Sequence, residues 1–198
     1  MSKKRKTSPG RLQRKKDTRE ERQRFLIVCE GRETETNYFA KFRVYKKVVG
    51  LGRNPSNIVE AAKNLREKYK GDYDQIWCVF DRNSWQADDF NSAIRDAKKE
   101  KINVAYSNEA FELWYLLHFE FVNTGIPRKD YEKKLTKLLG YKYQKNSDSM
   151  YDDLIDRQET AIEHAENLLK QYDPHNPAKD NPSTTVHLLV QELNRFIR

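Results

Sequence analysis

The hydrophobic and polar positions of this chain alternate between short apolar runs and longer stretches with helical spacing. The short runs are rich in β-branched and aromatic residues and predict strands at residues 25–28, 45–49, 75–80 and 102–106. Between them, the apolar spacing predicts helices at residues 34–45, 54–71 and 87–101. Alternating strands and helices favour an α/β fold with a parallel sheet, helices on both faces and right-handed crossovers.

The second half of the chain shows helical patterns only. Helices are predicted at residues 110–119, 128–139, 151–172 and 184–198. We expect this half to pack against one end of the sheet rather than to form an independent domain. The predicted division is a basic flexible arm at 1–23, an α/β core at 24–120 and a C-terminal helical extension at 121–198 packed on that core.

Composition narrows the class of protein. Only 37% of the residues are hydrophobic and 34% are charged, so the core must be concentrated in the predicted strands. Cys29 and Cys78 both lie inside such strands and are expected to be reduced core thiols of a cytoplasmic protein. No apolar run is long enough for a membrane span, and none follows the basic N-terminus as in a signal peptide.

The excess positive charge lies in one segment. The chain has 38 Lys and Arg against 30 Asp and Glu, and residues 1–24 hold 11 of the basic and 3 of the acidic residues. The remainder therefore carries 27 of each sign and is neutral. Such an arm would neutralise nucleic-acid phosphates without reading sequence. A solubilising tail is the alternative interpretation.

Two of the predicted strands end in an acidic residue. Glu30 follows the first strand before a Gly31 turn, and Asp81 follows the strand at 75–80. Because the carboxyl ends of parallel strands share one edge of a sheet, the two carboxylates are expected to lie close together. Oxygen ligands suit Mg²⁺ or Mn²⁺, and Asn83 would complete such a site as a neutral ligand. The alternative is that the acids cap the turns that follow.

Four segments resemble the RloB-like family of bacterial anti-phage defence proteins: CEGRETETNYFAKF from Cys29, VFDRN from Val79, SNEAFELWYLLHF from Ser107 and NPSTTVHLLVQEL from Asn181. The strand-end acids also resemble those of the Toprim domain. The resemblance implies a Toprim-like, Rossmann-like sheet, a site role for Glu35 beside Glu30 and Asp81, and an AAA-type ATPase partner. The chain departs from the pattern at Asn83, where an acid is expected.

Further polar residues are candidates for binding the substrate. These are Arg32, Arg82, Asn108, Glu112, Ser183 and Thr184. Glu112 interrupts an apolar helix, so it either faces the metal edge or pairs with a Lys or Arg of the extension. Asn108 has an alternative role as a helix cap. Ser183 and Thr184 follow Asn181-Pro182, where exposed amides and hydroxyls could bind a phosphate, although a helix cap alone explains these residues.

These patterns lead to two functional hypotheses. The first is a Mg²⁺- or Mn²⁺-dependent, Toprim-like nuclease of a phage-defence system that uses Glu30, Glu35 and Asp81 for catalysis. The second is a non-catalytic nucleic-acid-binding or regulatory subunit of an ATPase-containing complex, suggested by the missing charge at Asn83. The sequence contains neither a P-loop nor a dinucleotide-binding motif. The choice between RNA and DNA and the oligomeric state are left open.

Overall fold

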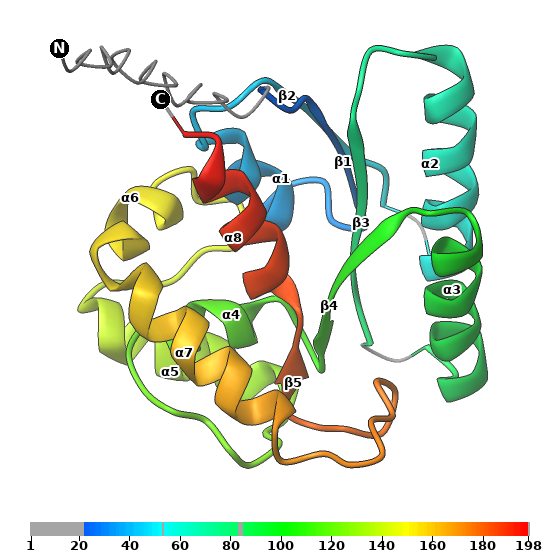
Figure 1. The fold of residues 1–198 in the computed structure, drawn as a ribbon. Coiled ribbons are helices and arrows are strands. Elements are labelled where there is room, and N and C mark those ends of the chain that lie inside the picture. The colour runs from blue at the N-terminus through cyan, green and yellow to red at the C-terminus, as the bar shows by residue number, and fades with distance from the viewer. Residues whose placement is uncertain (1–21, 53, 83–84, 198) are drawn as a thin grey trace, which may run out of the picture.

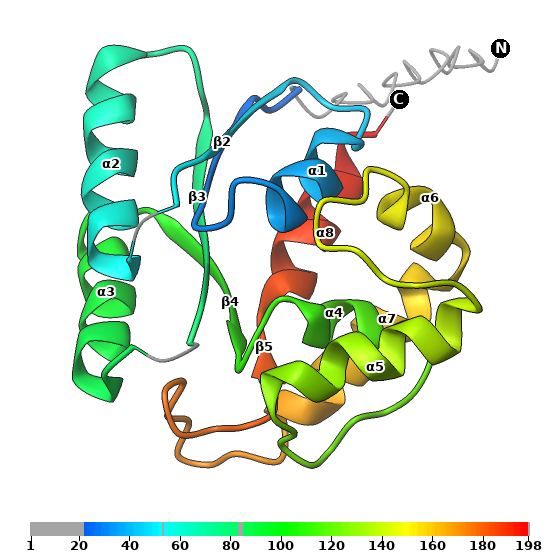
Figure 2. The ribbon, with the colours of Figure 1, turned by 180° about the vertical axis from the view of Figure 1, so that it is seen from behind.

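The computed structural model describes residues 22–52, 54–82 and 85–197. The basic arm, apart from its last residues, and Asn83 lie outside these ranges, so the predictions made for them are not tested. Within the described residues, a sheet is flanked by two groups of helices, as Figures 1 and 2 show from opposite sides.

The sheet has five strands in the order β2-β1-β3-β4-β5. Its first four strands in this order are parallel: β2 (Lys46–Gly50), β1 (Phe25–Cys29), β3 (Gln75–Asp81) and β4 (Asn103–Asn108). The predicted parallel α/β sheet is therefore confirmed. Strand β5 (Ser183–Thr184), at the edge opposite β2, is antiparallel to β4 and was not predicted.

Helices cover both faces of the sheet. Leu26 and Val28 of β1 face α2 (Pro55–Lys68) and α3 (Ala87–Lys99), whereas their neighbours along the strand face the opposite side. The opposite face is covered by α1 (Thr34–Ala40), α4 (Glu112–Leu117) and α8 (Val186–Arg195). Helix α1 ends five residues earlier than predicted, and an irregular segment leads from it into β2.

The rest of the second half adds α5 (Arg128–Leu139), α6 (Met150–Leu154), a 3₁₀ turn (Ile155–Arg157) and α7 (Gln158–Leu169). The predicted helix at 151–172 is therefore interrupted. These helices share one hydrophobic core with Phe25 and Trp77 of the sheet. They lie on the same side of the sheet as α1, α4 and α8, where α5 and α7 contact α4 and α6 contacts α1.

The segment at 181–185 also differs from its prediction. The helix does not begin beside Pro182, because Ser183 and Thr184 pair with β4 and the helix begins at Val186. The Thr184 hydroxyl donates to the carbonyl of Tyr106 at 2.9 Å, and the Thr185 hydroxyl accepts from the Tyr106 amide at 3.0 Å. Because these hydroxyls bond to the backbone of β4, residues 183–184 extend the sheet by a strand instead of capping a helix.

Cys29 and Cys78 are buried free thiols, as expected from their strands. Burial raises the pKa of both thiols, which keeps them in the neutral form. None of the described helices combines the length and the hydropathy that a membrane span requires.

Candidate functional site

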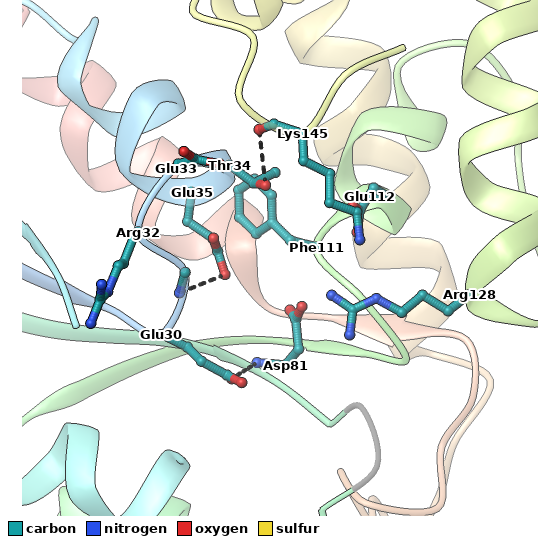
Figure 3. A pocket seen from close by; sticks show the side chains of 11 residues that line it. Glu30, Arg32, Glu33, Thr34, Glu35, Asp81, Phe111, Glu112, Arg128 and Lys145 are labelled. Atoms are coloured by element: carbon teal, nitrogen blue, oxygen red, sulfur yellow. Dashed lines mark hydrogen bonds and ion pairs between the residues drawn. The ribbon is translucent and has the colours of Figure 1, made fainter. Parts of the chain in front are cut away.

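A cavity of about 420 Å³ lies where β1 and β3 end, below the first turn of α1 (Figure 3). Its lining is mostly charged. It consists of Glu30, Gly31, Arg32, Glu33, Thr34, Glu35, Asp81, Phe111, Glu112, Arg128 and Lys145. The prediction that Glu30 and Asp81 share one edge of the sheet is confirmed.

The turn after β1 positions the first part of the cavity. The Gly31 amide donates to Oε1 of Glu35 at 3.3 Å, and the Thr36 hydroxyl donates to the Gly31 carbonyl at 2.9 Å. Gly50 of β2 lies against this turn, and a side-chain carbon there would be 2.6 Å from the Gly31 carbonyl oxygen and 2.7 Å from the Arg32 Cα. Only glycine fits at this position without a shift of backbone.

We therefore expect Gly50→Ala to lower the free energy of unfolding by about 1–3 kcal/mol, because the added methyl group overpacks against backbone atoms. The matched control is Gly125→Ala, where the nearest atoms belong to the Asn181 side chain, which can move. Urea denaturation of both variants measures the difference. An equal loss of stability in the two variants would contradict this account of the turn.

Glu30 is held by two donors. The backbone amide of Asp81 donates to its Oε2 at 3.0 Å, and the Trp85 indole donates to its Oε1 at 3.2 Å. Burial raises the pKa of Glu30, and these two hydrogen bonds oppose that rise. Figure 3 shows the Glu30 carboxylate turned toward the Asp81 backbone rather than toward the Asp81 carboxylate.

Asp81 has the most unfavourable environment among these acids. It is buried, and its Oδ1 has no hydrogen-bond partner among the described residues. Burial raises its pKa well above the usual range, and the negative charges of Glu35 and Glu30 raise it further. The Arg128 guanidinium points toward this carboxylate and partly offsets the rise.

Glu35 is also buried, with 4% of its surface exposed. Burial, together with the charges of Glu30 and Glu112, raises its pKa to about 7. Its carboxyl group lies across the cavity from that of Asp81 (Figure 3). The structure therefore brings together the three residues predicted to be catalytic, in surroundings that disfavour three negative charges without a cation.

Glu112 satisfies both of the alternatives left open by the sequence. It lines the acidic cavity, and its Oε1 lies 3.7 Å from the Lys145 ammonium of the helical extension. The same oxygen accepts a hydrogen bond from the Tyr143 hydroxyl at 3.3 Å. Lys145 also pairs with Glu132 at 3.1 Å, so the ammonium lies between two carboxylates.

The sequence did not identify Arg128 and Lys145 as site residues. Arg128 is the first residue of α5, and Lys145 lies in the segment between α5 and α6, outside the predicted helices. Both come from the extension and reach the cavity through tertiary packing. Their residue types alone gave no signal, since each is one of 38 basic residues.

The remaining predicted substrate-binding residues divide into two groups. Arg32 lines the cavity, whereas Arg82 donates from its Nε to the Ala178 carbonyl at 3.2 Å and is not part of the lining. Asn108, Ser183 and Thr184 are buried and donate to carbonyls of Pro177, Asp180 and Tyr106, respectively. The expectation of exposed hydroxyls at 183–184 is wrong, and the geometry gives no support for substrate contacts by these three residues.

The acidic cavity offers oxygen ligands, which is the type of ligand that a hard divalent cation prefers. Carboxylate oxygens suit Mg²⁺ and Mn²⁺, and the unpartnered Oδ1 of Asp81 is available as a ligand. Among the described residues, however, no three His, Cys, Asp or Glu side chains are already arranged as a metal-binding group. Binding would therefore require the carboxylates to rotate toward one another, and Asn83 lies outside the described residues.

Comparison with protein families matches the chain to the model described as "RloB-like protein" over residues 25–193. The matched region begins at β1 and ends within α8, so it includes every residue that lines the acidic cavity. Comparison with curated proteins and with solved structures gave no match.

Proposed function

The chain belongs to the RloB-like family, and from its acidic cavity we propose that it is a metal-dependent nuclease that hydrolyses phosphodiester bonds. The observation that carries the proposal is the buried Asp81 carboxylate, which lacks a hydrogen-bond partner for Oδ1 and lies among other acids. A cluster of buried acids with raised pKa values is typical of functional sites.

Asp81 and Glu35 would hold Mg²⁺ or Mn²⁺, with Glu30 as a third oxygen donor once it is released from Trp85. The bound cation would supply Lewis-acid charge stabilisation to the phosphodiester and lower the pKa of a bound water. Without a cation, mutual repulsion and burial favour the protonated acids, as the raised pKa values of Asp81 and Glu35 indicate.

Arg128 and Lys145 supply the positive charge on the opposite side of the cavity. A guanidinium group binds phosphate oxygens through paired hydrogen bonds, and an ammonium group acts as a point charge. We propose that Arg128 orients the scissile phosphate beside Asp81, and that Lys145 balances Glu112 and binds a neighbouring phosphate. These roles require no recognition of bases, so RNA and DNA are both candidate substrates.

The wider setting is proposed from the family resemblance alone. It comprises a role in phage defence, a Toprim-like mode of action and an AAA-type ATPase partner. The basic arm would add phosphate contacts that weaken as salt is raised.

The test is incubation of the protein with a mixture of labelled RNA and DNA in Mg²⁺, in Mn²⁺ or in EDTA. We expect cleavage with at least one of the cations and none in EDTA. Cleavage that continues unchanged in EDTA, or no cleavage of any substrate under any condition, would contradict the proposal.

A regulatory or nucleic-acid-binding subunit is the second candidate. It is favoured by the lack of three pre-arranged metal ligands among the described residues. Calorimetric titration with Mn²⁺ in the presence of nucleic acid separates the two. The nuclease should bind Mn²⁺ at millimolar concentration or below, whereas the subunit should bind nucleic acid without Mn²⁺.

A further inference from the structure

A second cavity, of about 430 Å³, lies on the opposite face of the sheet, between the end of α3, the strand β4 and the segment before β5. It shares no lining residue with the acidic cavity. Its volume is within the range that holds small molecules, roughly 300–1,000 Å³. The floor is apolar and is formed by Ile94, Ile102 and Val104.

Two lysines, Lys98 and Lys101, line this cavity and are exposed. Neither is within ion-pair distance of an acidic side chain among the described residues, whereas the neighbouring Lys99 is paired with Asp96 at 2.9 Å. Lysines near a helix C-terminus also complement the helix dipole, which explains their charge in part. It does not explain the backbone at Lys101.

Lys101 has a φ of 56°, which is the left-handed conformation. It follows the last turn of α3, where the Ile102 amide donates to the Ala97 carbonyl at 2.9 Å, and the Lys101 amide donates to the Lys98 carbonyl at 3.1 Å. This is the helix-ending turn that strongly favours glycine. Lys101 therefore places an ammonium group beside the cavity at a position where glycine would fit the backbone better.

The far wall is a hydrogen-bonded chain of three side chains. His175 Nδ1 lies 2.6 Å from the buried Asp180 carboxylate, and its Nε2 lies 2.7 Å from the Tyr106 hydroxyl. The Asp180 carboxylate also accepts from the Asn176 amide at 2.7 Å. Both ring nitrogens of His175 are therefore engaged, so the ring is fixed beside Tyr106, at an angle of 31° to the Tyr106 ring.

We propose that this second cavity binds a nucleotide unit, with its base on the apolar floor beside the Tyr106 and His175 rings and its phosphate on Lys98 and Lys101. The combination of an apolar and aromatic lining with two ammonium groups matches a ligand that has an aromatic ring and an anionic group. Free mononucleotides and the end of a nucleic-acid strand share this chemistry, and the experiment distinguishes them.

The test is calorimetric titration in EDTA with AMP, UMP, inorganic phosphate and a 5′-phosphorylated tetranucleotide. We expect at least one mononucleotide or the tetranucleotide to bind at millimolar concentration or below, and inorganic phosphate to bind at least tenfold more weakly. Tighter binding of the tetranucleotide identifies a strand end, and equal binding of AMP or UMP identifies a free nucleotide.

Three variants assign the binding to this cavity. Lys98→Gln and Lys101→Gly should each weaken binding about tenfold, and Lys99→Gln, which changes the paired lysine outside the cavity, should not. Because glycine relieves the left-handed backbone, Lys101→Gly should keep or raise the melting temperature, so its loss of binding cannot result from unfolding. The proposal would be overturned if Lys98→Gln and Lys101→Gly bound the probe as tightly as Lys99→Gln does. It would also be overturned if inorganic phosphate alone bound as tightly as the nucleotides, or if no probe bound.

Discussion

Replacing Glu35 with glutamine is expected to raise the free energy of unfolding at pH 8 by about 3 kcal/mol and to leave it nearly unchanged at pH 4.5. The folded protein raises the pKa of this buried carboxyl group from 4.5 to about 7, so it favours the protonated form. The stability that protonation contributes is fully present below the unfolded pKa and is lost as the pH rises through the folded pKa. Glutamine resembles the protonated acid at every pH.

Urea denaturation of the wild type and of Glu35→Gln at the two pH values, in EDTA, measures this difference. Glu33→Gln is the matched control, because Glu33 lies two residues away, lines the same cavity and is exposed. The control should change stability by less than about 0.5 kcal/mol at either pH. If Glu35→Gln stabilised the protein equally at both pH values, burial of an ionised Glu35 carboxylate at pH 8 could not be the cause.

Asp81→Asn is expected to reduce metal-dependent cleavage at least a hundredfold. Even residues that only support a metal ligand contribute roughly 10- to 100-fold, and Asp81 is proposed as a direct ligand. The substitution nearly preserves shape and replaces an acid whose charged form is disfavoured by burial, so stability at pH 8 should not fall. Reduced cleavage together with unchanged stability separates a loss of catalysis from a loss of the folded structure.

Initial cleavage rates in Mn²⁺, with the melting temperature of each variant, test this prediction. Asp96→Asn is the control, because Asp96 is an exposed residue of α3 outside the acidic cavity. A variant at Asp81 that melts like the wild type and retains its cleavage rate would remove Asp81 from the site.

The parallel sheet was predictable because each of its longer strands is marked by a short apolar run in the sequence itself. Runs such as 25–28 and 75–80 are apolar without interruption, and parallel strands place the acids that follow them at the same edge. The central pair, Glu30 and Asp81, therefore followed from the sequence. Glu35 was implied by a family resemblance rather than by spacing.

The unpredicted features depend on contacts between distant parts of the chain. Arg128 and Lys145 reach the cavity only because α5 and the segment after it pack over α4. Strand β5 has two residues, too few for a hydrophobic pattern, and it forms because Thr184 and the adjacent Thr185 complete the edge of β4. The position of the extension likewise depends on a hydrophobic core that it shares with Phe25 and Trp77, which no periodicity reveals.

The measurement that tests the central claim most directly is cleavage of labelled RNA and DNA by the double variant Glu30→Gln, Asp81→Asn in Mg²⁺ and in Mn²⁺. It requires a parallel check by circular dichroism that the variant is folded. If the acidic cavity is the catalytic site of a metal-dependent nuclease, the wild type cleaves and the folded double variant shows no cation-dependent cleavage. Cleavage by the double variant at the rate of the wild type would show that the chemistry, if any, lies elsewhere on the protein.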